Sequence, residues 1–177
     1  MPETIVKLIK TIPNISVDLF EKALDHDEFW MTCITGLDRV NVKTTGEGKM
    51  HWNLKASLIL DPLGMAKIPV EIEQDLLRKE DKTFKGEGKK YIFTVANSNA
   101  ASAAEGNLFF KQIGQDLKIM VEVTRLDLKA GFLDVAGLGK AVIVGRLQQE
   151  MQQMITNLVD LAARGKIADI LHGTGQH

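Results

Sequence analysis

Residues 141–164 read AVIVGRLQQEMQQMITNLVDLAAR, and this stretch decides the fold. Its large apolar side chains recur at spacings of four, three, four and three residues: Leu147, Met151, Met154, Leu158 and Leu161. That spacing places them on one face of an α-helix, while glutamines, Asn157 and Asp160 occupy the other faces. A helix of this length extends about 35 Å, enough to cross a small domain. The apolar face needs a partner, and the preceding chain supplies a sheet.

The chain before this helix is mostly β-strand. Between residues 39 and 124, apolar and polar residues alternate with the two-residue period of a strand that has one buried face. The clearest case is 50–60, where Met50, Trp52 and Leu54 share one face. The predicted strands are residues 4–12, 39–45, 50–60, 68–73, 84–95, 108–113 and 117–124.

Turn and cap residues separate these elements. Ser16 is a predicted N-cap for a short helix, and residues 28–32 add a second helical turn that Gly36 closes. Gly86 and Gly88 are interpreted as glycines within a strand that ease its curvature. Further turns or bends are predicted at 46–48, 61–64, 79–82, 97–104 and 114–115.

Together these elements predict an α+β fold. The regular alternation favours antiparallel strands with one face toward solvent. We therefore expect a seven-stranded antiparallel curved sheet around the long C-terminal helix, with two short helices after the first strand. Residues 1–166 form a single domain, and residues 167–177 are expected to be a short tail. A sheet that curls around one helix leaves space between them, so we expect a ligand cavity there.

Composition and charge argue against several classes of function. The 177 residues are 45% apolar and 25% charged, which is ordinary for one globular domain. A net charge of −1 lacks the basic excess of a nucleic-acid binder. Cys33 is the single cysteine and the four histidines lack zinc-site spacing, so we expect no metal and no cofactor. The chain shows no apolar leader and no apolar run of about 18 residues, so we expect a soluble, cytoplasmic protein.

Several short runs resemble a known family. They are SVDLF at 16–20, CITGL at 33–37, KGEGK at 85–89, AASAAEG at 100–106, and Gly131 followed by AGLG at 136–139. In order and spacing, the chain resembles the helix-grip fold of the START and polyketide-cyclase-like superfamily, most closely the G-subunit family of carbon monoxide dehydrogenase. The resemblance implies an accessory protein that binds a lipophilic ligand, such as a quinone or an isoprenoid-like molecule, and serves a partner redox enzyme.

The inward face of the predicted sheet is apolar and carries no nucleophile, base and orienting group together. Our first hypothesis is therefore non-catalytic binding or carriage of a hydrophobic small molecule. Two alternatives stay open: a cyclase- or hydratase-type enzyme acting on an aromatic or polyketide-like substrate in the same cavity, and an assembly factor whose surface binds a partner enzyme. The predicted cavity residues are Trp52, Leu54, Ala56, Leu58, Val70, Ile72, Tyr91, Phe93, Ile119, Val121, Phe132, Leu147, Met151, Met154 and Leu158.

The segment 130–133 joins the last strand to the long helix, so it must cross one end of the sheet. Phe132 and Leu133 are read either as a plug over the cavity or as a gate that dips into a bilayer to exchange the guest. Burial of such a side chain contributes about 1.5–3 kcal/mol, which predicts a transient peripheral membrane contact. Arg125 and Asp127 continue the apolar face of the last strand, either at the cavity mouth or exposed beyond it.

Overall fold

The computed structural model describes residues 4–34, 37–42, 49–59, 67–131 and 140–172. The expected turns at 46–48 and 61–64 and the expected role of Gly36 lie outside the described residues. The elements are β1 (Val6–Ile12), α1 (Val17–Ala23), α2 (Asp27–Cys33), β2 (Leu37–Asn41), β3 (Lys49–Ile59), β4 (Lys67–Glu80), β5 (Lys89–Ser98), β6 (Ala101–Ile113), β7 (Asp116–Leu128), α4 (Lys140–Ala163) and α5 (Lys166–His172).

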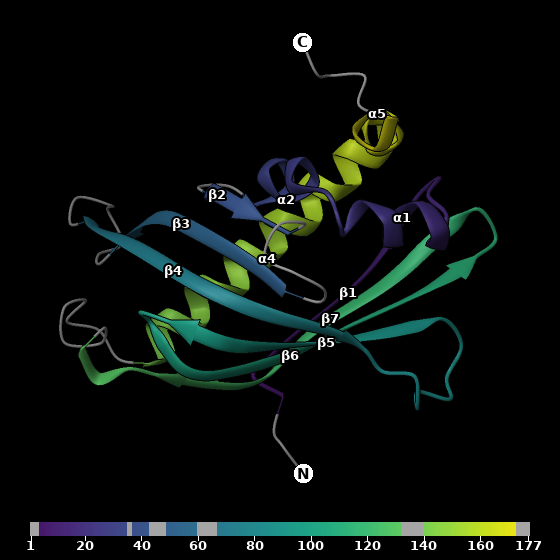
Figure 1. Cartoon of the computed structure of the whole chain (residues 1–177). Helices are drawn as coiled ribbons and strands as arrows, with labels where there is room; N and C mark the ends of the chain where they lie inside the picture. The colour runs from purple at the N-terminus through teal and green to yellow at the C-terminus, as the bar shows by residue number, and fades with distance from the viewer. Residues whose placement is uncertain (1–3, 35–36, 43–48, 60–66, 132–139, 173–177) are drawn as a thin grey trace.

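The strands form one seven-stranded sheet in the order β1-β7-β6-β5-β4-β3-β2, and every neighbouring pair is antiparallel. Figure 1 shows the sheet curving around α4, with α1, α2 and α5 gathered near the C-terminal end of that helix. α4 packs against β1, α2 and α5, and α1 packs against α5. The predicted curved sheet, long C-terminal helix and pair of short helices after the first strand are confirmed.

The two short helices form where the sequence predicts them. The Oγ of Ser16 accepts a hydrogen bond from the backbone N–H of Leu19 at 3.0 Å, which confirms Ser16 as the N-cap of α1. The inner side of α1 buries Phe20 and Ala23. α2 is tied to α1 because Nε1 of Trp30 donates to the backbone oxygen of Leu24 at 2.9 Å.

The chain beyond α4 forms a further helix, although its residues were expected to be a tail. Gly165 has a φ of 67°, a left-handed conformation that ends α4 and turns the chain. α5 then buries Ile167 and Ile170, which lie three residues apart on one helical face. Burial of these two isoleucines against the core accounts for the order of the segment.

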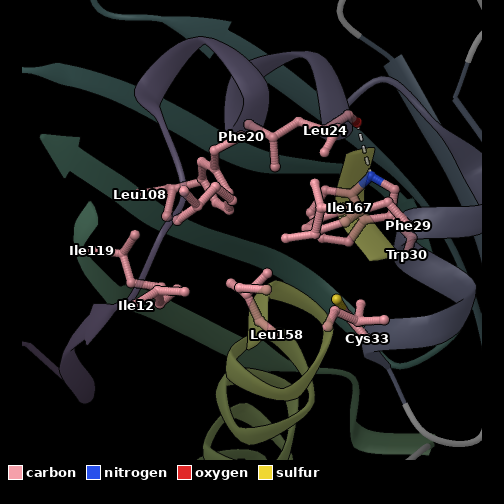
Figure 2. Close-up of a cluster of buried hydrophobic side chains, with 14 of the residues drawn as sticks. Ile12, Phe20, Leu24, Phe29, Trp30, Cys33, Leu108, Ile119, Leu158 and Ile167 are labelled. Atoms are coloured by element: carbon pink, nitrogen blue, oxygen red, sulfur yellow. Dashed lines mark hydrogen bonds between the residues drawn. The ribbon is translucent and has the colours of Figure 1, made fainter. Parts of the chain in front are cut away.

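The hydrophobic core lies where α1, α2, α4 and α5 meet the strands. Figure 2 shows Phe20, Phe29, Leu158 and Ile167 converging there from four helices, with Ile12 from β1 facing them. The rings of Phe20 and Phe29 pack edge to face with centroids 6.1 Å apart. The last turns of α4 therefore bury Leu158, Leu161 and Ala162, while Asp160 and Ala163 stay exposed on the opposite side.

Residues 84–88 were expected to continue a strand, and this prediction is wrong. Asp81 starts a turn: its Oδ1 accepts from the backbone N–H of Thr83 at 3.0 Å and from Thr83 Oγ1 at 2.6 Å. β5 begins at Lys89, so Gly86 and Gly88 lie in the loop before it. Gly88 has a φ of 87°, which L-residues avoid.

A bulge shifts the inward face along β7. β6 pairs Glu105 with Arg125 and Gly106 with Val123, so Thr124 is an extra residue in β7. Beyond it, Leu126 is buried, whereas Arg125 is exposed and pairs with Asp127 at 2.8 Å. Of the two interpretations of Arg125 and Asp127, a place at the cavity mouth or exposure beyond it, exposure is therefore correct.

Candidate functional site

The inner face of the sheet is closed at one end and open at the other. On β6 and β7, Phe110, Leu117 and Ile119 are at most 1% exposed. On β3 and β4, the inward-facing residues Trp52, Leu54, Ile72 and Gln74 are half-buried. Cross-strand partners share a face, so the pairing of Trp52 with Gln74 and of Leu54 with Ile72 places these four together. We call this region, with the facing part of α4, the open end.

On α4, Leu147 and Met154 are half-buried and belong to the open end. Met151, between them, is buried. The orientation of the helix is fixed by Asn157, whose Nδ2 donates to the backbone oxygen of Cys33 in α2 at 2.8 Å. Positions 146, 150, 154 and 157 lie along one flank of a helix. The flank that contacts α2 therefore continues, toward the start of α4, into Met154, Glu150 and Arg146.

The predicted cavity residues divide between these two regions. At the open end, Trp52, Leu54 and Ile72 come together on β3 and β4, Met154 packs against the same core cluster as Trp52 and Leu54, and Leu147 is half-buried on α4. Two others, Ile119 and Leu158, belong to the closed core, and Val121 is half-buried beside it. Ala56, Leu58 and Val70 lie in β3 and β4, but their side chains fall outside the described part of the structure. Phe132 and Leu133 also lie outside the described residues.

Tyr91 and Phe93 are near α1 and α2. The ring of Phe93 packs edge to face against Trp30 at 6.5 Å, and Tyr91 stacks on Phe110 at 5.8 Å. The guanidinium of Arg78 lies 5.5 Å from the centre of the Tyr91 ring. Both predicted residues therefore contribute to the packing of the short helices onto β5.

A polar network at this closed end was not predicted. Oη of Tyr91 donates to Oε2 of Glu21 at 2.8 Å, and Nζ of Lys89 lies 2.5 Å from the same oxygen. Burial, together with the Glu21 carboxylate, raises the pKa of Tyr91 well above its usual range. The hydrogen bond to Glu21 raises the pKa of Lys89. Because Glu21 and Tyr91 are 70 positions apart, only the fold brings them together.

The open end also carries polar atoms. Gln74 pairs with Ser98 on its other side, so Trp52, Gln74 and Ser98 form a row across three strands on the inner face. Ser98 is buried, and its Oγ accepts the backbone N–H groups of Ala100 and Ala101. The Nε1 atom of Trp52 is buried and has no hydrogen-bond partner among the described residues.

Described residues line two surface hollows, and both linings mix charged with apolar side chains. One, of about 400 Å³, lies beside β2 and is lined by Met31, Asp38, Arg39, Val40, Asn41 and His51. The other, of about 760 Å³, is lined by residues 77–83 and Ile92. Near the first, His51 lies between Asp75 at 2.5 Å and Glu73 at 3.1 Å. Among the described residues, no group of three or more His, Cys, Asp or Glu has metal-binding geometry.

None of the described helices is long and apolar enough to cross a membrane. No protein-family model matches the chain, and no curated protein matches its sequence.

Several solved structures resemble the fold of this chain. TTHA0849 from Thermus thermophilus superposes with a TM-score of 0.64 at 12% identity, over 90% of this chain and 97% of that one. A START superfamily protein from Mycobacterium smegmatis gives a TM-score of 0.60 at 7% identity, over 89% and 97%. The di-domain ARO/CYC protein StfQ of the steffimycin biosynthetic pathway gives 0.53 at 14% identity, over 91% of this chain and 51% of StfQ. At these identities the likeness shows the fold, which is the helix-grip fold expected from the sequence.

Proposed function

We propose that this protein binds a hydrophobic small molecule at the open end, between β3, β4 and residues 147–154 of α4. The observation that carries the proposal is the difference in burial along one apolar inner face. Large apolar residues at the closed end are almost fully buried, whereas Trp52, Leu54, Leu147 and Met154 remain half-buried. Apolar side chains that face each other and still have accessible surface are what a lipophilic ligand would cover.

Binding is favoured over catalysis because of where the inward titratable groups lie. Tyr91 and Arg78 face inward, but both are held in the packing of α1: Tyr91 by Glu21, and Arg78 by the backbone oxygen of Leu24 at 2.9 Å. A general acid or base must reach the reacting group of its substrate. On the strands of the open end the described inward side chains are apolar or neutral polar groups, and on α4 the charges of Arg146 and Glu150 are paired with each other.

The direct test is the content of the purified protein. Organic extraction of freshly purified protein, followed by mass spectrometry, is expected to release an apolar compound in a fixed ratio to the protein. A protein that is consistently empty, and that also fails to bind fatty acids, quinones and hydrophobic dyes, would contradict the proposal.

A matched pair of substitutions tests the location of the site. Leu54→Trp adds bulk at the open end and is expected to weaken binding of a hydrophobic dye at least about tenfold, because it occupies space that the ligand needs. Leu77→Trp makes the same change on β4, where Leu77 is 39% exposed, and is expected to leave the affinity unchanged. Circular dichroism checks that both variants fold. Equal affinities of the two variants would place the binding elsewhere.

Finer parts of the proposal rest on the family resemblance. They are a quinone or isoprenoid-like guest, a partner redox enzyme of the carbon monoxide dehydrogenase kind, and transient membrane contact through Phe132. The mass of the extracted compound tests the first. Liposome flotation of ligand-free protein tests the last: partial binding that Phe132→Asp abolishes is expected, and equal flotation of both proteins would contradict it.

A further inference from the structure

The two tryptophans of the chain differ in their hydrogen bonding. Nε1 of Trp30 donates to the backbone oxygen of Leu24 at 2.9 Å. Nε1 of Trp52 is equally shielded from solvent but has no acceptor. A buried N–H without a partner destabilises a protein, and the great majority of such groups are paired. An unpaired donor at the edge of a half-buried apolar region therefore points to an acceptor that a ligand supplies.

The position of Trp52 supports this interpretation. Trp52 packs against the core from the inner face of β3, directly opposite Gln74 in β4. The Gln74 carboxamide has an acceptor oxygen, yet the indole N–H remains unpaired. The donor thus lies in the region where Leu54, Leu147 and Met154 offer apolar surface to a ligand.

The charges at the open end indicate that the acceptor is neutral. Arg146 is the cationic residue on the flank of α4 that continues from Asn157. Glu150, 2.8 Å from its Nη2, balances its charge, although its buried Nε has no hydrogen-bond partner among the described residues. A carboxylate buried beside Trp52 would meet no cation among these residues whose charge is not already balanced, and an uncompensated buried charge is strongly unfavourable. A carbonyl oxygen accepts a hydrogen bond without bringing a charge.

We propose that the open end binds neutral apolar molecules that carry a carbonyl oxygen, and that the indole N–H of Trp52 donates a hydrogen bond to this oxygen. This inference rests on the proposed function and adds the chemical class of the ligand. Apolar contact provides most of the affinity, and Trp52 selects a ketone over a hydrocarbon of the same shape.

Two probes of similar shape separate these contributions. 2-Acetylnaphthalene has the carbonyl oxygen, and 2-ethylnaphthalene lacks it. Titration into ¹⁵N-labelled full-length protein is expected to show binding of both, with the ketone about three- to tenfold tighter, which is the range of one net hydrogen bond. The ketone should shift the indole ¹⁵N–¹H signal of Trp52 downfield. The Trp30 indole signal is the internal control and should stay in place, because its donor is already paired.

Trp52→Phe keeps an aromatic ring and removes the donor. In this variant the two probes are expected to bind with equal affinity. If both probes bind the parent protein equally and the Trp52 indole signal does not respond specifically to the ketone, the carbonyl inference is wrong while the hydrophobic site stands. If neither probe binds, the proposed function fails as well. The indole signal of the parent protein decides the matter even if the variant does not fold.

Discussion

At the scale of single residues, the backbone oxygen of Leu24 connects three elements. It accepts from Nε1 of Trp30 in α2 and from Nη1 of Arg78 in β4, both at 2.9 Å. Arg78 also forms an ion pair with Asp25. The end of α1 is thus held to α2 and to the sheet at one point.

We predict that Trp30→Phe and Arg78→Met each lower the free energy of unfolding by about 1–3 kcal/mol, because each removes a largely buried donor. Lys79→Met is the control, since Lys79 is an exposed neighbour of Arg78 in β4. Urea unfolding of the three variants provides the comparison. If Lys79→Met lowers the free energy of unfolding as much as Arg78→Met does, the hydrogen bond from Arg78 to Leu24 makes no specific contribution to stability.

Cys33 is a buried free thiol, and burial raises its pKa from the ordinary value of 9.0 to about 12. We expect it to react with a disulfide reagent at pH 8 far more slowly in the native protein than in denaturant. The raised pKa contributes stability that is fully present below about pH 9 and is lost as the pH rises toward 12. Cys33→Ala should therefore reduce the loss of stability over that alkaline range. Fast stoichiometric labelling of native protein would contradict this.

Single-residue contacts were the least predictable feature of the chain. The alternation of β5 predicted that Tyr91 faces inward, but not that it meets Glu21 of α1. A pattern of two-residue period specifies the face of a strand and carries no information about which helix covers that face. The unpaired indole of Trp52 was equally invisible, because it depends on every neighbour that the fold supplies.

At the scale of elements, periodicity predicted the existence of the strands and the long helix, but β4 (Lys67–Glu80) and β6 (Ala101–Ile113) extend far beyond the predicted 68–73 and 108–113, and β6 takes up part of the bend expected at 97–104. The predicted 141–164 became Lys140–Ala163, and the predicted hairpin turn at 114–115 joins β6 to β7. The turn at 79–82 was predicted, but the bulge at Thr124 and the continuation of the loop to Gly88 were missed. Both depend on local hydrogen bonds and on close backbone approaches, which apolar periodicity does not encode.

The apolar face of α4 allows a test on one helix. Leu158→Ala is expected to lower the free energy of unfolding by about 2–5 kcal/mol, because Leu158 is 4% exposed in the closed core. Leu147→Ala is expected to have a clearly smaller effect, since Leu147 is half-buried at the open end. Thermal and urea unfolding measure both. Equal losses would indicate that α4 is closed along its whole length.

Two glycines of positive φ provide a second matched test. Gly114 has a φ of 61°, and an added Cβ would meet no other atom within 4 Å, so Gly114→Ala should destabilise by about 1–2 kcal/mol from conformation alone. Gly88 has a φ of 87°, and an added Cβ would lie 2.2 Å from the backbone oxygen of Phe110. Gly88→Ala should therefore be the more destabilising change. The reverse order in urea unfolding would mean that the loop before β5 is not held against β6.

At the scale of the whole molecule, one apolar face serves two purposes. α1, α2 and α5 close it around the last turns of α4, whereas Trp52, Leu54, Ile72, Leu147 and Met154 stay half-buried. The sequence could predict a cavity between sheet and helix, but it could not divide the candidate residues between core and cavity. Ile119 and Trp52 follow the same alternation, and only the packing of the short helices distinguishes them.

The measurement that tests this account most directly is the position of a bound apolar probe. Intermolecular NOEs from 2-ethylnaphthalene to the methyl groups of the full-length protein report that position. The account predicts contacts to Leu54, Leu147 and Met154, and none to the buried Leu158 or to the outward-facing Leu77. Contacts confined to Leu77, or to other methyl groups on the outer face of the sheet, would contradict it.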